Sequence, residues 1–102
     1  MKYQLVLQLP YSEIRDYDAM IAIEEVIIKN IGSLGKVDGH DAGSGEMNIF
    51  IHTDHPKLAF EQICRIIGSK DFMADMKVAY REFNSDTYTI LFPPDLSHFE
   101  VI

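Results

Sequence analysis

The sequence predicts a single α+β domain in which two helices cover one face of an antiparallel β-sheet. Several short segments alternate apolar and polar residues, which is typical of strands with one buried face. Two longer segments repeat apolar residues at a helical spacing. The segments follow one another as strand, helix, strand, twice over, and a length of 102 residues fits one domain, residues 1–102.

The first strand is predicted over residues 2–9, ending at Pro10. Its alternation places one set of residues on the buried face: Tyr3, Leu5, Leu7 and Leu9. The opposite face then carries Gln4, Val6 and Gln8. This strand therefore has an apolar residue on each side of the sheet.

The first helix is predicted over residues 13–31, with Gly32 as its stop. Its main apolar arc consists of Ala19, Met20, Ile23, Val26, Ile27 and Ile31. Two isoleucines, Ile21 and Ile28, lie outside this arc. Because the arc that packs on the core does not include them, we expect a neighbouring segment or a partner to cover these two isoleucines.

A weak second strand is predicted over residues 36–42, with Gly39 marking a bulge or a sheet edge. Gly43-Ser44-Gly45 is predicted to form the hairpin turn that follows. The third strand, residues 47–53, is predicted to turn Met47, Ile49 and Ile51 to one face. Its other face carries Asn48, Phe50 and His52.

Asp54 is predicted to cap a second helix that begins at Pro56 and ends at Gly68. The apolar stripe of this helix consists of Leu58, Ala59, Phe60, Ile63, Cys64 and Ile67. Two more strands are predicted over residues 76–83 and 87–92, with Met76, Val78 and Tyr80 on one face of the former. The apolar tail beyond Pro93-Pro94 is expected to dock, with the spare face of the first helix as one location.

The resulting order, β-α-β-β-α-β plus an extra C-terminal hairpin strand, resembles the ferredoxin-like sandwich. The resemblance covers residues 2–83 and depends on element order alone. It implies an antiparallel sheet with two helices on one face. Because this fold serves many unrelated functions, it predicts none of them.

Composition restricts the classes of partner. A net charge of −7 disfavours nucleic acids and anionic membranes and favours a basic partner. The single cysteine, Cys64, excludes an internal disulfide and fits a reducing compartment. The N-terminal residues make a poor signal peptide, and no apolar stretch is long enough for a membrane span. We therefore expect a cytoplasmic protein.

Histidines and carboxylates gather between Lys36 and Lys57, a stretch with no other basic residue besides histidine. Asp38 and His40 would share a strand face, and His52 on the next strand could approach them. These are ligands that zinc or manganese accepts, although the spacing matches no established motif and a solvated hairpin is the alternative. His52 is also a candidate general base, against the alternative of a surface histidine.

Three further candidates have stronger structural alternatives. Cys64 is a candidate nucleophile, but its place on an apolar stripe favours an inert role. The Gly43-Ser44-Gly45 segment is a candidate phosphate loop, but it lies between two strands rather than before a helix. Phe50 could stack on RNA bases, but the acidic charge and the absence of an aromatic partner on the first strand oppose this.

The leading hypothesis is a non-catalytic protein-interaction module without a cofactor, because exposed apolar groups rimmed by polar ones mark contact sites. The first candidate surface is the sheet face opposite the helices: Gln4, Val6, Gln8, Asn48, Phe50 and His52. The second candidate surface is Ile21 and Ile28.

This module would be a homodimer or an acidic inhibitor or immunity-type protein that masks a basic partner. Four carboxylates would supply the complementary charge: Asp38, Asp41, Glu46 and Asp54. The alternative is a small metal-dependent enzyme or ligand-binding protein that uses His40, His52 and nearby carboxylates.

Overall fold

The computed structural model describes residues 1–12, 14–43, 45–68 and 75–101. In chain order the elements are β1 (Tyr3–Pro10), α1 (Ile14–Asn30), the short 3-10 helix η1 (Gly32–Leu34), β2 (Lys36–Gly43), β3 (Glu46–Thr53), α2 (Pro56–Ile67), β4 (Lys77–Glu82) and β5 (Thr89–Phe92).

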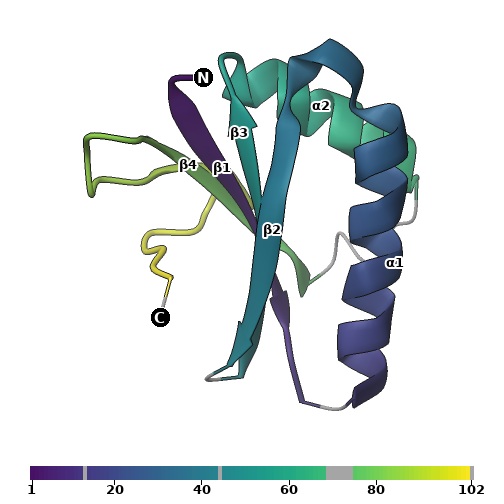
Figure 1. Ribbon diagram of the computed structural model, residues 1–102. Helices are drawn as coiled ribbons and strands as arrows, with labels where there is room; N and C mark the ends of the chain where they lie inside the picture. Colours follow the sequence, from purple (N-terminus) through teal and green to yellow (C-terminus); the bar gives the residue numbers. More distant parts are fainter. Residues whose placement is uncertain (13, 44, 69–74, 102) are drawn as a thin grey trace.

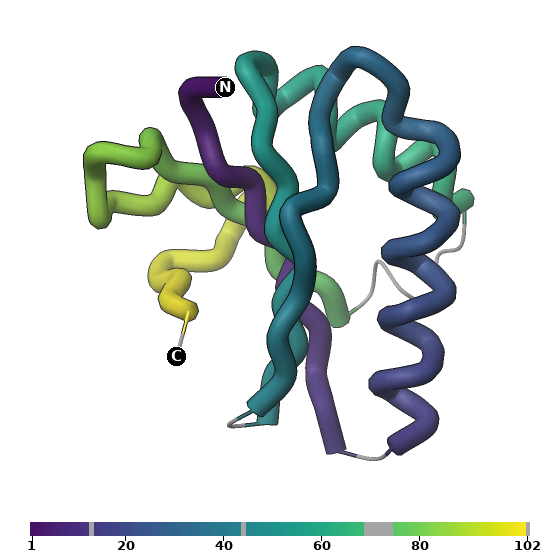
Figure 2. The backbone as a smooth tube through the Cα atoms, in the orientation of Figure 1, coloured from purple at the N-terminus to yellow at the C-terminus, as the bar shows by residue number. Residues whose placement is uncertain are grey.

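The five described strands form one antiparallel sheet in the order β2-β3-β1-β4-β5. Helices α1 and α2 lie on one side of this sheet, and the C-terminal segment lies on the other side (Figure 1, Figure 2). The α+β class, with an antiparallel sheet and two helices in the described ranges, is therefore confirmed.

The main core lies between the sheet and the helices. As predicted from their alternation, Leu5, Leu7 and Leu9 of β1 point into it. They meet buried side chains of β3, β4 and both helices: Met47, Ile49, Ile51, Val78, Met20, Ile23, Ile27, Ala59 and Ile63. Burying one leucine or isoleucine side chain contributes about 1.5–3 kcal/mol, so this layer supplies much of the driving force for folding.

The residues at the centre of each predicted apolar helix arc are buried as expected, but some residues at the edges of the arcs are exposed. Met20, Ile23 and Ile27 of α1 are buried, but Val26 is exposed. On α2, Leu58 is 50% exposed although it lies within the predicted stripe. A helix buries the stripe that meets its neighbours, and that stripe is narrower than the apolar arc. Neither described helix combines the length and apolar character that a membrane crossing requires.

The start of α2 differs from the prediction. The cap residue of α2 is His55, and no side-chain hydrogen bond caps the helix. Asp54 instead accepts a hydrogen bond at Oδ1 from the backbone nitrogen of Lys2 at 2.9 Å. Just before it, Oγ1 of Thr53 accepts from the backbone nitrogen of His55 at 2.9 Å and donates to the carbonyl of Leu34 at 2.6 Å. The buried Thr53 hydroxyl thus connects η1, the end of β3 and the start of α2.

A second, smaller apolar cluster lies on the other side of the sheet. Its buried members are Val6 of β1, Ala79 of β4 and Phe99 of the tail. Leu96 and Val101 of the tail pack against them. The tail therefore does not dock on α1 as expected, because Val6 and Ala79 are direct neighbours in register and offer it a continuous apolar surface. Ile102 and Ser44, which belong to the predicted tail and hairpin turn, lie outside the described residues.

Gly35 provides a stability test of the junction between η1 and β2. A Cβ atom at this position would lie 3.0 Å from both the carbonyl oxygen of His52 and Cγ2 of Ile51. We expect Gly35→Ala to lower the free energy of unfolding by about 1–3 kcal/mol, because the backbone must shift to admit the methyl group. Urea denaturation measures this loss.

Gly43→Ala is the matched control, because nothing lies within 4 Å of a Cβ at that site. Equal stability of the two variants would show that the close approach at Gly35 does not constrain the fold.

Candidate functional site

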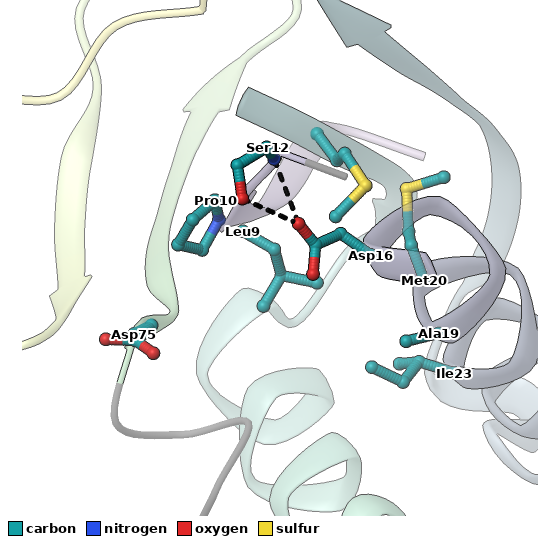
Figure 3. A pocket seen from close by; sticks show the side chains of 9 residues that line it. Leu9, Pro10, Ser12, Asp16, Ala19, Met20, Ile23 and Asp75 are labelled. Atoms are coloured by element: carbon teal, nitrogen blue, oxygen red, sulfur yellow. Dashed lines mark hydrogen bonds between the residues drawn. The ribbon is translucent and has the colours of Figure 1, made fainter. Parts of the chain in front are cut away.

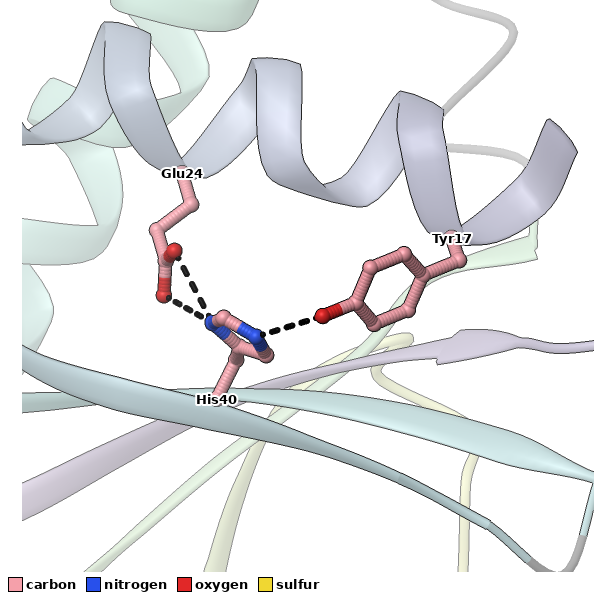
Figure 4. A network of polar contacts seen from close by, with 3 residues as sticks. All are labelled: Tyr17, Glu24 and His40. Carbon is pink, nitrogen blue, oxygen red and sulfur yellow. Dashed lines mark hydrogen bonds and ion pairs between the residues drawn. The ribbon is translucent and has the colours of Figure 1, made fainter. Parts of the chain in front are cut away.

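A chain of three polar side chains connects α1 to the edge strand β2 (Figure 4). Nδ1 of His40 lies 3.0 Å from both Oε1 and Oε2 of Glu24. Nε2 of the same ring lies 3.1 Å from the hydroxyl oxygen of Tyr17. Glu24 is only 8% exposed, so its carboxylate depends on His40 for a partner that replaces water.

Local geometry on both elements creates this cluster. Tyr17 and Glu24 are seven residues apart, so they lie two turns apart on one face of α1. His40 pairs with Ile49 in the β2–β3 register and points, like Ile49, to the helix side of the sheet. The sequence pattern indicates His40 but not its two partners, although the seven-residue spacing of Tyr17 and Glu24 places them on one face of a helix.

The chemistry of the cluster follows from its hydrogen bonds. A carboxylate only accepts hydrogen bonds, so Nδ1 of His40 is the donor to Glu24. In the neutral ring Nε2 would accept from the Tyr17 hydroxyl, and in the protonated ring it would donate to the hydroxyl oxygen. A carboxylate, an imidazole and a hydroxyl in this order could move a proton. These three residues do not line the hollow at the start of α1, the hollow between α1 and α2, or the two hollows that Tyr3 and Tyr80 line. The cluster of Tyr17, Glu24 and His40, called the clasp below, is best explained as a structural contact that holds β2 against α1.

The expected grouping of Asp38, His40 and His52 is wrong. The register of β2 on β3 shifts between Val37 and Gly39, which confirms the predicted bulge. Asp38 is the extra residue, so it and His40 point to opposite faces of the sheet. Oδ2 of Asp38 lies 3.5 Å from Nε2 of His52, away from the helices. Within the part of the chain that the structure describes, no three metal-ligating side chains come together.

His52 is half-buried on the sheet face opposite the helices. Its ring meets the ring of Phe83 edge to face, with centroids 4.7 Å apart. One terminal nitrogen of Arg81, Nη1, donates to the carbonyls of Glu82, Phe83 and Ser85, which holds that turn in place. His52 is therefore engaged in surface contacts, and its role as a general base stays a prediction.

The expectation of an open sheet face opposite the helices is wrong for half of its residues. Val6, Gln8 and Asn48 are buried, because the tail crosses the face at their positions. The other three residues, Gln4, Phe50 and His52, are half-buried. Of the two spare isoleucines, Ile21 packs partly against the main core, whereas Ile28 is 55% exposed.

The four predicted acidic residues follow the β2–β3 hairpin from its first strand to just beyond its second, and each has a polar partner. Asp38 pairs with His52, Asp41 accepts from Nδ2 of Asn48 at 2.8 Å, Glu46 lies 4.0 Å from Nζ of Lys77, and Asp54 accepts from the backbone of Lys2. Their role as a binding patch stays a prediction.

A hollow of about 290 Å³ lies where β1 ends and α1 begins (Figure 3). Apolar side chains of Leu9, Met20 and Met47 contribute to its lining. Its polar rim includes Asp16, whose Oδ2 accepts hydrogen bonds from the nitrogen and the hydroxyl of Ser12. This carboxylate organises the first turn of α1. The sequence did not single out this hollow, because its lining comes from β1, α1, β3 and Asp75, which lie far apart along the chain.

Cys64 is half-buried on α2, and burial raises the pKa of its thiol, with a further contribution from the charge of Glu61. The neutral thiol is a poor nucleophile. This environment agrees with the inert role that the sequence favoured over nucleophilic catalysis.

We expect Cys64 to react with iodoacetamide more slowly in the native chain than in urea, with a pH profile whose midpoint lies above the ordinary cysteine range. Mass spectrometry of the alkylated chain over a series of pH values measures both. A native thiol that reacts fully at pH 7 would contradict the pKa assignment.

No protein-family model, curated protein or solved structure matched the chain in the three comparisons made with it. The function must therefore be inferred from its own residues.

If the clasp stabilises the fold, replacing His40 should lower the free energy of unfolding more than replacing His52. We expect His40→Ala to lower the free energy of unfolding by about 1–3 kcal/mol, because it leaves the buried Glu24 carboxylate without its partner. Tyr17→Phe removes one outer hydrogen bond and should cost about 0.5–1.5 kcal/mol.

The control is His52→Ala, which removes a partly exposed contact with Asp38 worth at most about 1 kcal/mol. Urea unfolding of the three variants tests this order. A larger loss for His52→Ala than for His40→Ala would refute the clasp.

Proposed function

We propose that this chain is a non-catalytic protein-interaction module that binds an extended, basic segment of a partner along β2. The observation that carries this proposal is the open outer edge of β2. In the described part of the chain this eight-residue strand pairs with β3 alone. A row of backbone donors and acceptors along a sheet edge is a template for strand addition.

The local features of β2 favour a selective partner over indiscriminate pairing. The bulge at Asp38 interrupts the first half of the strand, so that regular pairing geometry runs from Gly39 to Gly43. Small residues there, Gly39, Ala42 and Gly43, leave room for another backbone to approach. The exposed carboxylates of Asp38 and Asp41 favour a segment that carries lysine or arginine.

One exposed residue of α1, Ile28, extends this surface. Tyr17, Ile21, Glu24 and Ile28 follow one another at three- and four-residue spacings, so they form one stripe on the helix. Tyr17 and Glu24 of this stripe bond His40, which places the stripe alongside β2. The exposed Ile28 would then contact an apolar side chain of the bound segment.

Charge argues for a different partner rather than a second copy. Two copies of a chain with a net charge of −7 repel each other, and antiparallel pairing of two β2 strands brings their aspartates close. A homodimer through the same edge is the competing arrangement, and the experiment below distinguishes it.

We also propose that the chain has the ferredoxin-like architecture. Its two strand-helix-strand halves, and the adjacent central positions of β1 and β3, support this assignment, with β5 as an added edge strand. The single cysteine supports a reducing compartment such as the cytoplasm.

The binding surface can be tested with a synthetic peptide that alternates lysine with valine and threonine. We expect it to shift the amide resonances of residues 38–43 in heteronuclear NMR spectra. Ile28→Lys should weaken binding about tenfold, because the new charge repels the peptide and removes an apolar contact.

Leu58→Lys is the control, because Leu58 is exposed to a similar degree on the other helix. Shifts spread over the whole molecule, or equal binding of an aspartate-containing analogue, would contradict the proposal. A dimer in light scattering that Ile28→Lys dissociates would replace the basic partner with a second copy.

A further inference from the structure

The sheet face beneath the tail has the features of a second binding site. Val6 and Ala79 are fully buried there, although no helix covers them. The tail contributes Leu96, Phe99 and Val101 to their cover, and side chains outside the tail, Phe50, Tyr88 and Ile90, pack against the same cluster. The Phe99 ring also meets the ring of Tyr88, with centroids 5.0 Å apart. The irregular tail thus covers apolar residues on this face of the sheet, as the two helices do on the other face (Figure 1).

A polar ladder runs beside these apolar contacts. Nε2 of Gln8 donates to the backbone carbonyl of Glu100 at 2.9 Å and to Oδ1 of Asn48 at 3.0 Å. Nδ2 of Asn48 donates in turn to Asp41. A buried side-chain amide that donates to a backbone carbonyl can hold a chain of any sequence, because every residue carries a backbone carbonyl. One bond of the ladder, from Gln8 to the Glu100 carbonyl, thus holds peptide backbone, and Asn48 fixes the Gln8 amide that makes it.

The tail is attached in a manner that permits its release. Residues 93–101 form neither a helix nor a strand, so no ladder of backbone hydrogen bonds ties them to the sheet. Gln8 and Asn48, which the tail shields, are polar and can bond water when it leaves. The helix-side core has no such groups on β1, where Leu5, Leu7 and Leu9 lie, so only the tail side tolerates opening.

We propose that this face binds an extended apolar segment of a partner and that the tail is the built-in occupant that the partner displaces. The tail itself defines the ligand chemistry: apolar side chains spaced like Leu96, Phe99 and Val101, and a backbone carbonyl that accepts from Gln8. This site lies on a different surface from the β2 edge and does not depend on the function proposed for that edge.

Opening of the tail can be measured with two buried alanines. Ala79 lies under the tail and Ala59 lies in the main core, and both are 0% exposed. In a Cys64→Ala background, Ala79→Cys and Ala59→Cys each introduce one thiol of the same size. We expect dithiobis(nitrobenzoic acid) to react with the thiol at position 79 at least about tenfold faster, because only that site opens without global unfolding. Equal rates would overturn the proposal.

Binding is tested with a labelled peptide of residues 95–101 added to the full-length chain. In the wild type the tail competes for the face at a high effective concentration, so the peptide should bind weakly. We expect Phe99→Asp to tighten peptide binding at least about tenfold by releasing the tail. His98→Asp is the control, because the His98 side chain in the same tail is exposed.

Fluorescence polarisation measures these affinities. No tightening in a folded Phe99→Asp chain would overturn the binding site, even if the tail opens. If Phe99→Asp unfolds the chain, the tail is part of the permanent core, and equal reactivity of the two cysteines would accompany this result.

Discussion

The two-sided burial of β1 is the constraint on which the rest of the structure depends. Because successive side chains of a strand point to opposite faces, the run from Leu5 to Leu9 sends leucines to one side and Val6 to the other. A central strand with apolar groups on both faces requires a cover on each side of the sheet. Two helices provide one cover and the irregular tail provides the other, which makes a three-layered molecule from a short chain.

The two covers differ in the strength of their attachment. On the helix side, large aliphatic side chains of the sheet and of both helices are buried together. On the tail side, the buried residues of the sheet are Val6 and Ala79 together with the polar residues Gln8 and Asn48. Close-packed aliphatic layers resist separation, but a polar strip loses little when water replaces its partner. The same sheet thus supports a permanent interior on one face and an exchangeable contact on the other.

The bulge at Asp38 organises the edge of the sheet in a comparable way. One extra residue in β2 sends His40 toward α1 and leaves Asp38 with His52 on the far side. The imidazole that reaches α1 ties the edge strand to the body of the protein. The outer edge of β2 consequently stays in place while its backbone groups remain available to a partner strand.

Periodicity in the sequence by itself determined the strands, the helices and the residues at the centre of the main core, since side-chain direction alternates in a strand and rotates in a helix whatever lies nearby. The expected Gly39 irregularity has the same local origin. Only the tertiary structure decided where the tail docks and which residues meet His40. These depend on distant segments that converge in space, such as Phe99 on Val6 and Glu24 on His40, and no local pattern encodes which distant surface is nearest.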